Sequence, residues 1–167
     1  MEPLVAAIAA GNCAVLKPSG KTPHTSALLN RFIGELFDEA EVAVVEGDAD
    51  VGQALLDLPF DHIFYTGSTH VGHTVMAAAA RHLSSVTLEL GGKSPTIVDE
   101  TADIRAAAER VVWGKYVNAG QTCVAPDYVL VHASRTAEFL SEAKRALAAL
   151  YGGTDAARAT TPDYCRL

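Results

Sequence analysis

Short apolar segments alternate with longer segments of helical periodicity along the chain, and this alternation restricts the folds that it can adopt. The short segments lack a clean alternation of polar and apolar residues, which is typical of parallel strands covered on both faces. They lie at residues 14–16, 41–45, 61–66, 86–90, 96–98 and 128–131. Because strands that alternate with helices build parallel sheets, we predict an α/β fold with a parallel sheet.

The longer segments carry apolar residues three and four positions apart, as amphipathic helices do. They span residues 22–37, 48–56, 67–82, 103–112 and 136–150. Asp48 and Asp103 stand at the starts of two of these segments and are good N-cap residues. Residues 1–16 indicate a buried helix running into the first strand, and the chain from Gly152 is expected to be irregular. In the last helix, four residues are expected to face inward: Leu140, Ala143, Leu147 and Leu150.

The composition of the 167 residues is that of a globular protein, with 49% hydrophobic and 20% charged residues. The net charge is −7, from 13 basic and 20 acidic side chains, and no lysine or arginine cluster is present. These values argue against nucleic acid and anionic membranes as partners. Cys13, Cys123 and Cys165 are too scattered for a disulfide framework or a zinc site, which favours a reducing, cytoplasmic setting. The apolar start of the chain reaches Lys17 too soon to form a membrane span.

A turn containing two glycines, Gly67 and Gly72, joins a predicted strand to a predicted helix. Such glycines let backbone amides approach a phosphate, and a helix N-terminus favours its negative charge. The stretch is one substitution from a nucleotide-binding P-loop, because His73 stands where that loop has lysine. A phosphate- or nucleotide-binding protein is therefore an alternative, as is a turn that needs glycine for its backbone alone. His70 and His73 have no further ligand at a suitable spacing, so no metal site is expected.

Three further side chains are candidates for chemistry. Glu89 closes an apolar segment, where a carboxylate either finds a partner, serves as a general base or points into solvent. Cys123 follows a glycine in a polar turn, where it is either an accessible nucleophile or a small buried apolar residue. Lys17 follows the first predicted strand, at the edge where open α/β sheets bind ligands, and it either contacts a ribose or is solvated.

Taken together, four motifs in this order resemble the aldehyde dehydrogenase family, and the resemblance covers nearly the whole chain. They are Lys17-Pro-Ser19, Tyr65-Thr-Gly-Ser-Thr-His-Val-Gly72, Leu88-Glu-Leu-Gly-Gly-Lys-Ser-Pro95 and Gly120-Gln-Thr-Cys123. The stretch Cys123-Val-Ala-Pro-Asp-Tyr128 is similar to the class 3 branch, which includes fatty and aromatic aldehyde dehydrogenases. The resemblance implies a partial Rossmann-like cofactor-binding domain at residues 1–90, leading into the first part of an α/β catalytic domain at residues 91–167.

The resemblance also implies an NAD(P)-dependent oxidation of an aldehyde to a carboxylic acid. In this role Cys123 attacks the aldehyde to give a thiohemiacetal, hydride passes to the nicotinamide, and Glu89 activates the water that hydrolyses the resulting thioester. Contacts with the cofactor are implied for seven residues: Lys17, Ser19, Gly67, Ser68, Gly72, Leu90 and Gly91. The implied cofactor is NAD or NADP, the implied partner is a small aldehyde, and full-length relatives are expected to be homo-oligomers.

Two departures from the family pattern lead to further hypotheses. The family's upstream asparagine of the oxyanion hole and its downstream half lie outside this sequence, so a non-catalytic truncated remnant is an alternative to an active fragment. Gly20 stands where many relatives have a glutamate that holds the ribose 2′-hydroxyl. A glutamate at this position would repel the 2′-phosphate of NADP. Because glycine removes that repulsion, use of both NAD and NADP is expected.

Overall fold

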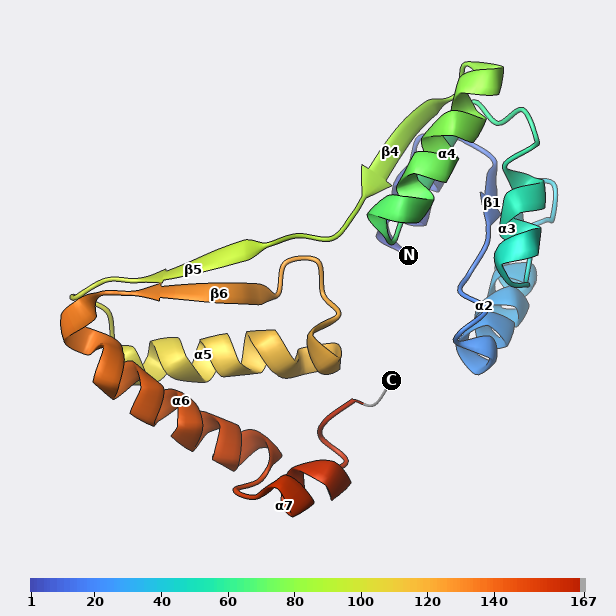
Figure 1. Ribbon diagram of the computed structural model, residues 1–167. Helices are drawn as coiled ribbons and strands as arrows, with labels where there is room; N and C mark the ends of the chain where they lie inside the picture. Colours follow the sequence, from blue (N-terminus) through green and yellow to red (C-terminus); the bar gives the residue numbers. More distant parts are fainter. Residues whose placement is uncertain (166–167) are drawn as a thin grey trace. The chain divides into compact units, whose positions relative to one another are not determined.

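The computed structural model describes residues 1–165, and its backbone separates into two compact units at the bond between Glu89 and Leu90. Both units combine helices with parallel strands (Figure 1). Among the described residues, no helix has both the length and the apolar character needed to cross a lipid bilayer.

The first unit contains two consecutive β-α-β arrangements. Its elements are α1 (Glu2–Ala9), β1 (Ala14–Leu16), α2 (Pro23–Leu36), β2 (Val42–Val44), α3 (Ala49–Leu55), β3 (His62–Thr66), α4 (Thr69–His82) and β4 (Ser85–Glu89). Strand β1 pairs in parallel with β2 across α2, and β3 pairs in parallel with β4 across α4. Two parallel strands need such a crossover, because a tight turn joins only antiparallel neighbours.

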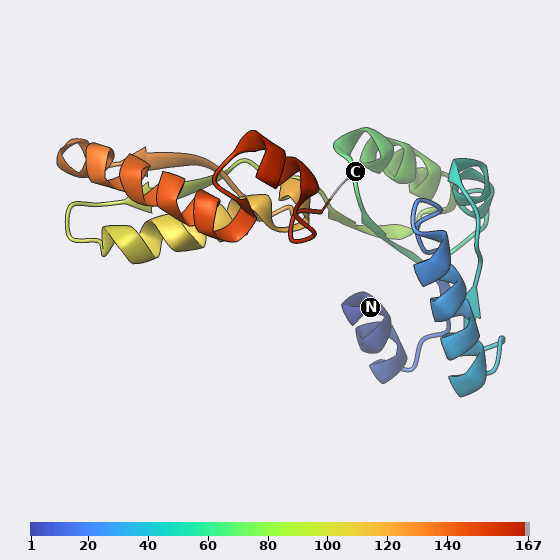
Figure 2. The ribbon, with the colours of Figure 1, turned by 90° about the horizontal axis from the view of Figure 1, so that it is seen from below.

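The second unit contains a third β-α-β arrangement, followed by two more helices. Its elements are β5 (Ser94–Val98), α5 (Ile104–Tyr116), the 3₁₀ helix η1 (Val117–Gly120), β6 (Pro126–Val131), η2 (Ala133–Arg135), α6 (Thr136–Tyr151) and α7 (Asp155–Thr160). Strand β5 pairs in parallel with β6, with a register irregularity at Ser94 and Pro95. Helices α5 and α6 lie together on one face of this strand pair (Figures 1 and 2).

Apolar side chains between the strands and their covering helices form the cores. In the first unit, Leu4, Ile33 and Val42 bring α1, α2 and β2 together. In the second unit, the largest cluster joins β5 to α5 and α6 through four buried residues: Val98, Ile104, Ala108 and Phe139. Burial of these side chains supplies most of the stabilising free energy of such an arrangement, at about 25 cal/mol per Å² of apolar surface.

The predicted parallel α/β class is confirmed, because strands alternate with helices and all three strand pairs are parallel. Four local predictions are wrong, one of them the cap at Asp48, whose side chain accepts no hydrogen bond from the first turn of α3. Helix α1 is not buried, since Leu4 is its only buried residue. Leu140 and Leu150 do not face inward but are exposed at the surface of α6. The segment after Gly152 is not irregular throughout, because it forms α7, whose first turn is capped by the Thr154 hydroxyl.

Candidate functional site

Lys17 lies at the carboxyl end of β1 and holds two loops together. Its half-buried side chain reaches the loop after β2, where Nζ donates hydrogen bonds to the carbonyl oxygens of Gly47, at 2.8 Å, and Pro18, at 2.9 Å. An ammonium group has three N–H donors, so one donor is left for a further acceptor. Lys17 is therefore positioned at the strand edge where open parallel sheets bind ligands.

Ser19 organises the turn that leads into α2. Its hydroxyl accepts a hydrogen bond from the N–H of Lys21 at 3.2 Å, and its carbonyl oxygen accepts one from the buried Ser26 hydroxyl at 2.8 Å. The Ser19 side chain itself is exposed. The turn is thus anchored from the side of α2, while the Ser19 hydroxyl still faces solvent.

The turn that begins at Gly67 joins β3 to α4, as the sequence predicted for a phosphate-binding turn. Ser68 is the N-cap of α4, and its hydroxyl accepts a hydrogen bond from the N–H of Val71 at 3.3 Å. A Cβ atom on Gly67 would overlap the Tyr65 hydroxyl, the far end of a side chain that would then have to move. Gly67 thus packs beside the Tyr65 side chain, whereas Gly72 is buried within α4.

Glu89 is the last residue of β4 and lies beside this turn. It is paired with Thr66 across the two strands, and its carbonyl oxygen accepts a hydrogen bond from the N–H of Gly67 at 3.0 Å. The side chain is exposed, in agreement with the solvent-facing alternative for this carboxylate. The structure thus brings Glu89 and Gly67 together at the carboxyl ends of two parallel strands.

Cys123 lies in the turn between η1 and β6, in the second unit, and its thiol is exposed. The segment before it is strained. Asn118, Ala119 and Gly120 have φ values of 52°, 54° and 77°, three consecutive residues in the left-handed region. This conformation costs about 1–2 kcal/mol for a residue with a Cβ atom, and such strain concentrates at functional sites.

Gly92 packs against the backbone of the Cys123 turn. A Cβ atom on Gly92 would lie 2.6 Å from the carbonyl oxygen of Cys123, closer than real Cβ contacts. A Cβ on the neighbouring Gly91 would meet no atom within 4 Å. Within residues 1–165, the backbone N–H of Cys123 has no hydrogen-bond partner. An exposed thiol beside a free N–H can attack a carbonyl carbon and stabilise the oxyanion that forms.

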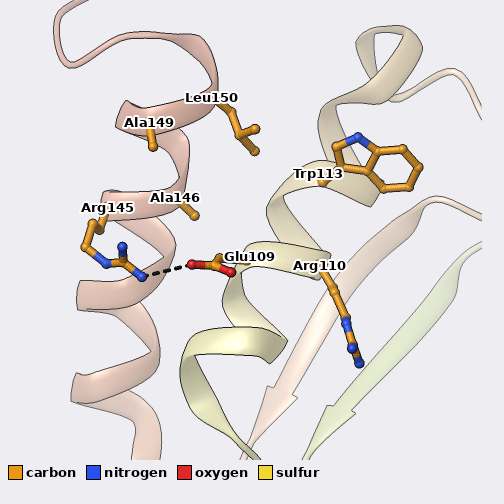
Figure 3. A pocket seen from close by; sticks show the side chains of 7 residues that line it. All are labelled: Glu109, Arg110, Trp113, Arg145, Ala146, Ala149 and Leu150. Atoms are coloured by element: carbon orange, nitrogen blue, oxygen red, sulfur yellow. Dashed lines mark hydrogen bonds and ion pairs between the residues drawn. The ribbon is translucent and has the colours of Figure 1, made fainter.

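A pocket of about 350 Å³ lies elsewhere in the second unit, between α5 and α6 (Figure 3). Its lining residues are Glu109, Arg110, Trp113, Arg145, Ala146, Ala149 and Leu150. An ion pair of 3.1 Å joins Glu109 to Arg145 across it. Hydrogen bonds from Arg105 and then Arg145 lower the pKa of the exposed Glu109 carboxyl. The pocket contains none of the site residues predicted from the sequence.

His70 and His73 lie in the first turns of α4, and both are exposed. Over residues 1–165, no three histidine, cysteine or acidic side chains gather closely enough to hold a metal ion. Leu90 is half-buried and Gly91 is exposed, and both lie in the segment that connects β4 to β5.

Comparison with known proteins gives a consistent result. The chain is 49% identical to 4,4′-diaponeurosporen-aldehyde dehydrogenase of Staphylococcus aureus, over 99% of the chain and 36% of that protein. It is 46% identical to aldehyde dehydrogenase family 3 member A2 of Mus musculus, over 100% of the chain and 34% of that protein. The chain thus spans about a third of the length of these relatives. The mouse relative is named a family 3 member, in agreement with the predicted class 3 resemblance.

Solved structures agree with the curated relatives. A substrate-bound structure of Staphylococcus aureus AldH matches 99% of the chain and 36% of its own length, with 49% identity and a TM-score of 0.89. The structure of PnpE in complex with nicotinamide adenine dinucleotide matches 87% of the chain and 30% of its own length, with 36% identity and a TM-score of 0.78. The model of the aldehyde dehydrogenase family matches residues 1–162. The chain therefore belongs to the aldehyde dehydrogenase family.

Proposed function

We propose that this chain carries the nucleophile, the general base and part of the dinucleotide-binding surface for the oxidation of an aldehyde to a carboxylic acid. The observation that carries the proposal is the turn at Cys123. An exposed thiol follows three left-handed residues, lies against Gly92 and stands beside an N–H without a partner. Membership of a family whose relatives are named aldehyde dehydrogenases supports the same chemistry.

The proposed reaction begins with the Cys123 thiolate. Its sulfur forms a bond to the aldehyde carbon, and the carbonyl π electrons move to the oxygen, giving a thiohemiacetal oxyanion. The free N–H of Cys123 stabilises this oxyanion. In other enzymes, removal of one comparable donor lowers the rate by about 10²–10³-fold. A nicotinamide dinucleotide, when bound, would supply the hydride acceptor, and Cys123 would then hold the oxidised carbon as a thioester.

Glu89 completes the proposed cycle. Its carboxylate takes a proton from water, the hydroxide attacks the thioester carbon, and the carbon–sulfur bond breaks to release the carboxylic acid and the Cys123 thiolate. The exposed position of the Glu89 side chain supports this role, because water reaches it directly. The hydrogen bond from Gly67 to the Glu89 carbonyl fixes the backbone that carries the base.

The dinucleotide would be held by the loops at the strand ends. Lys17 has a donor left for a ribose hydroxyl, and the Ser19 hydroxyl is exposed beside it. Gly67 and Ser68 would face the pyrophosphate at the N-terminal turn of α4, and Gly72 would lie behind them in the same turn. The donor set fits such a ligand, because helix N-termini favour phosphate and lysine donates to hydroxyls. The connecting residues Leu90 and Gly91 would lie near the nicotinamide end.

In this proposal, residues 1–90 are a partial NAD(P)-binding domain, and residues 91–167 begin the catalytic domain. The partner is a small aldehyde, and the longer relatives assemble as homo-oligomers. The cytoplasm is the proposed location, because Cys13 and Cys123 carry exposed thiols that a reducing compartment preserves.

Alkylation of the purified chain by an α-halo aldehyde near neutral pH, with and without NAD, tests the proposal. The adducts are located by mass spectrometry. We expect Cys123 to react about tenfold faster than the exposed Cys13, and NAD to increase the difference, because a positioned nucleophile outreacts an ordinary surface thiol. The Cys123→Ser variant should lose only the fast phase.

The same experiment decides between the active fragment and a non-catalytic remnant. Equal rates at both cysteines, unaffected by NAD, would contradict the proposal and favour the remnant. A titration with ATP and magnesium addresses the P-loop alternative at Gly67 and Gly72. We expect no binding, because His73 replaces the lysine on which that loop depends.

A further inference from the structure

Asp48 lies at the carboxyl edge of the β1–β2 pair and is the N-cap residue of α3, yet it does not cap that helix. Its side chain accepts no hydrogen bond from the first turn, contrary to the sequence expectation. Across residues 1–165, the exposed Asp48 carboxylate makes neither a hydrogen bond nor an ion pair. Because this carboxylate does not bind the N–H groups of its own helix, both of its oxygens are available as acceptors for a ligand.

The Asp48 carboxylate instead lies against Gly20. A Cβ atom on Gly20 would overlap Asp48 Oδ1 and would be 3.1 Å from Asp48 Cγ and 3.2 Å from the Gly47 carbonyl oxygen. The absent side chain at position 20 therefore leaves the space that this carboxylate occupies. A negative charge is present beside the turn after β1, although the residue in that turn is glycine.

The same edge carries the Lys17 ammonium group. Lys17 Nζ donates to the carbonyl oxygen of Gly47, the residue before Asp48, and keeps one N–H donor. The edge thus presents one free donor and two free acceptor oxygens within a short stretch of backbone. A vicinal diol matches this set, since each hydroxyl both donates and accepts.

We infer that Asp48 determines cofactor specificity, by accepting hydrogen bonds from the ribose hydroxyls of NAD and repelling the 2′-phosphate of NADP. The inference rests on the proposed dinucleotide binding and narrows it to NAD. An acidic residue at this edge of a dinucleotide-binding sheet binds the ribose 2′-hydroxyl, and a phosphate there carries about −1.5 to −2 charge. In this account, Asp48 supplies from the neighbouring loop the carboxylate that Gly20 lacks, and NAD would be preferred in place of the dual use expected from Gly20.

Calorimetric titration of the 167-residue chain with NAD and with NADP tests the inference, and the ratio of the two Kd values is the readout. We expect the wild type to bind NAD at least about tenfold more tightly, and Asp48→Asn to remove most of that preference by strengthening NADP binding. Asp50→Asn is the matched control, because it removes the same charge from an exposed residue of α3 and should leave the ratio unchanged.

A variant in which the residues at positions 20 and 48 are exchanged separates the effect of the carboxylate's position from any effect of Asp48 on folding. Gly20→Asp combined with Asp48→Gly returns a carboxylate to the same space from the other loop, and we expect it to restore the NAD preference. An Asp48→Asn ratio equal to that of the wild type would overturn the inference while leaving dinucleotide binding intact. Failure of the wild-type chain to bind either dinucleotide would overturn the proposed function itself, and the inference with it.

Discussion

Among single residues, Gly92 is the one whose replacement would disturb the Cys123 turn most directly. Its Cβ position lies 2.6 Å from the Cys123 carbonyl oxygen, so Gly92→Ala must displace the turn that carries the nucleophile. Displacement of a reacting group by about 1 Å costs as much as 10²-fold in rate. We therefore expect Gly92→Ala to slow the alkylation of Cys123 by about tenfold or more, measured by mass spectrometry over time.

The neighbouring glycine provides the control for this prediction. A Cβ on Gly91 would meet nothing within 4 Å, so Gly91→Ala should leave the Cys123 rate unchanged. The rate at Cys13 reports on general thiol reactivity in both variants. Equal slowing by the two substitutions would show that loss of glycine flexibility in the connecting segment, rather than contact with the Cys123 turn, governs the nucleophile.

The sequence identified Cys123 and Glu89 as candidates through the order of the motifs, but their surroundings depend on contacts distant in sequence. The left-handed conformation of Asn118 is compatible with its residue type, whereas that of Ala119 has no local signal. Likewise, the close approach of Gly92 to Cys123 joins positions about thirty residues apart, and no local pattern encodes it. Asp48 shows the converse, because it carries a strong local N-cap signal and yet its carboxylate lies against Gly20 and accepts no bond from α3.

At the scale of the elements, the two predicted aspartate caps had different outcomes, and they provide a paired test. Asp103 accepts a hydrogen bond from the N–H of Ala106 at 3.0 Å at the start of α5, whereas Asp48 makes no such bond at α3. We expect Asp103→Ala to lower the free energy of unfolding by about 1 kcal/mol, and Asp48→Ala to lower it by much less. Urea denaturation of both variants and the wild type measures the difference.

Equal destabilisation by the two alanine substitutions would contradict this account of the caps. The comparison also tests the assignment of Asp48, since a residue that stabilises its helix would not be available for a ligand. Helix α7 shows that a local cap signal can also be correct where the composition of a short segment is misleading. Thr154 followed by Asp155 is an N-cap signal, and the Thr154 hydroxyl does accept from the N–H of Ala157, but the polar composition pointed to an irregular segment.

At the scale of the whole molecule, helical periodicity predicted where helices lie more accurately than which faces are covered. The periodic pattern of α2 is clear, yet its residues Leu28, Phe32 and Leu36 are 53%, 52% and 58% exposed. These three positions, spaced four apart, form one apolar stripe along the helix, which we call the α2 stripe. Within residues 1–165, this stripe has no element packed over it and stays exposed, although its periodicity is that of a buried helix face.

The α2 stripe and the net charge together predict how the isolated chain behaves as pH changes. The charge is −7 at pH 7, and the isoelectric point is about 5.3, so mutual repulsion between molecules disappears as the pH falls towards that value. Contiguous exposed apolar residues then associate. We expect light scattering at fixed protein concentration to rise steeply between pH 7 and pH 5.3.

Substitution of all three residues of the α2 stripe by glutamine should reduce this scattering without altering the isoelectric point, since no charge changes. Leu58→Gln is the control, because Leu58 is 47% exposed but lies outside the stripe, and it should have little effect. A scattering profile unchanged by the triple substitution would mean that association arises from other surfaces. A profile equally reduced by Leu58→Gln would mean that total apolar exposure, and not its arrangement along α2, sets the solubility of the chain.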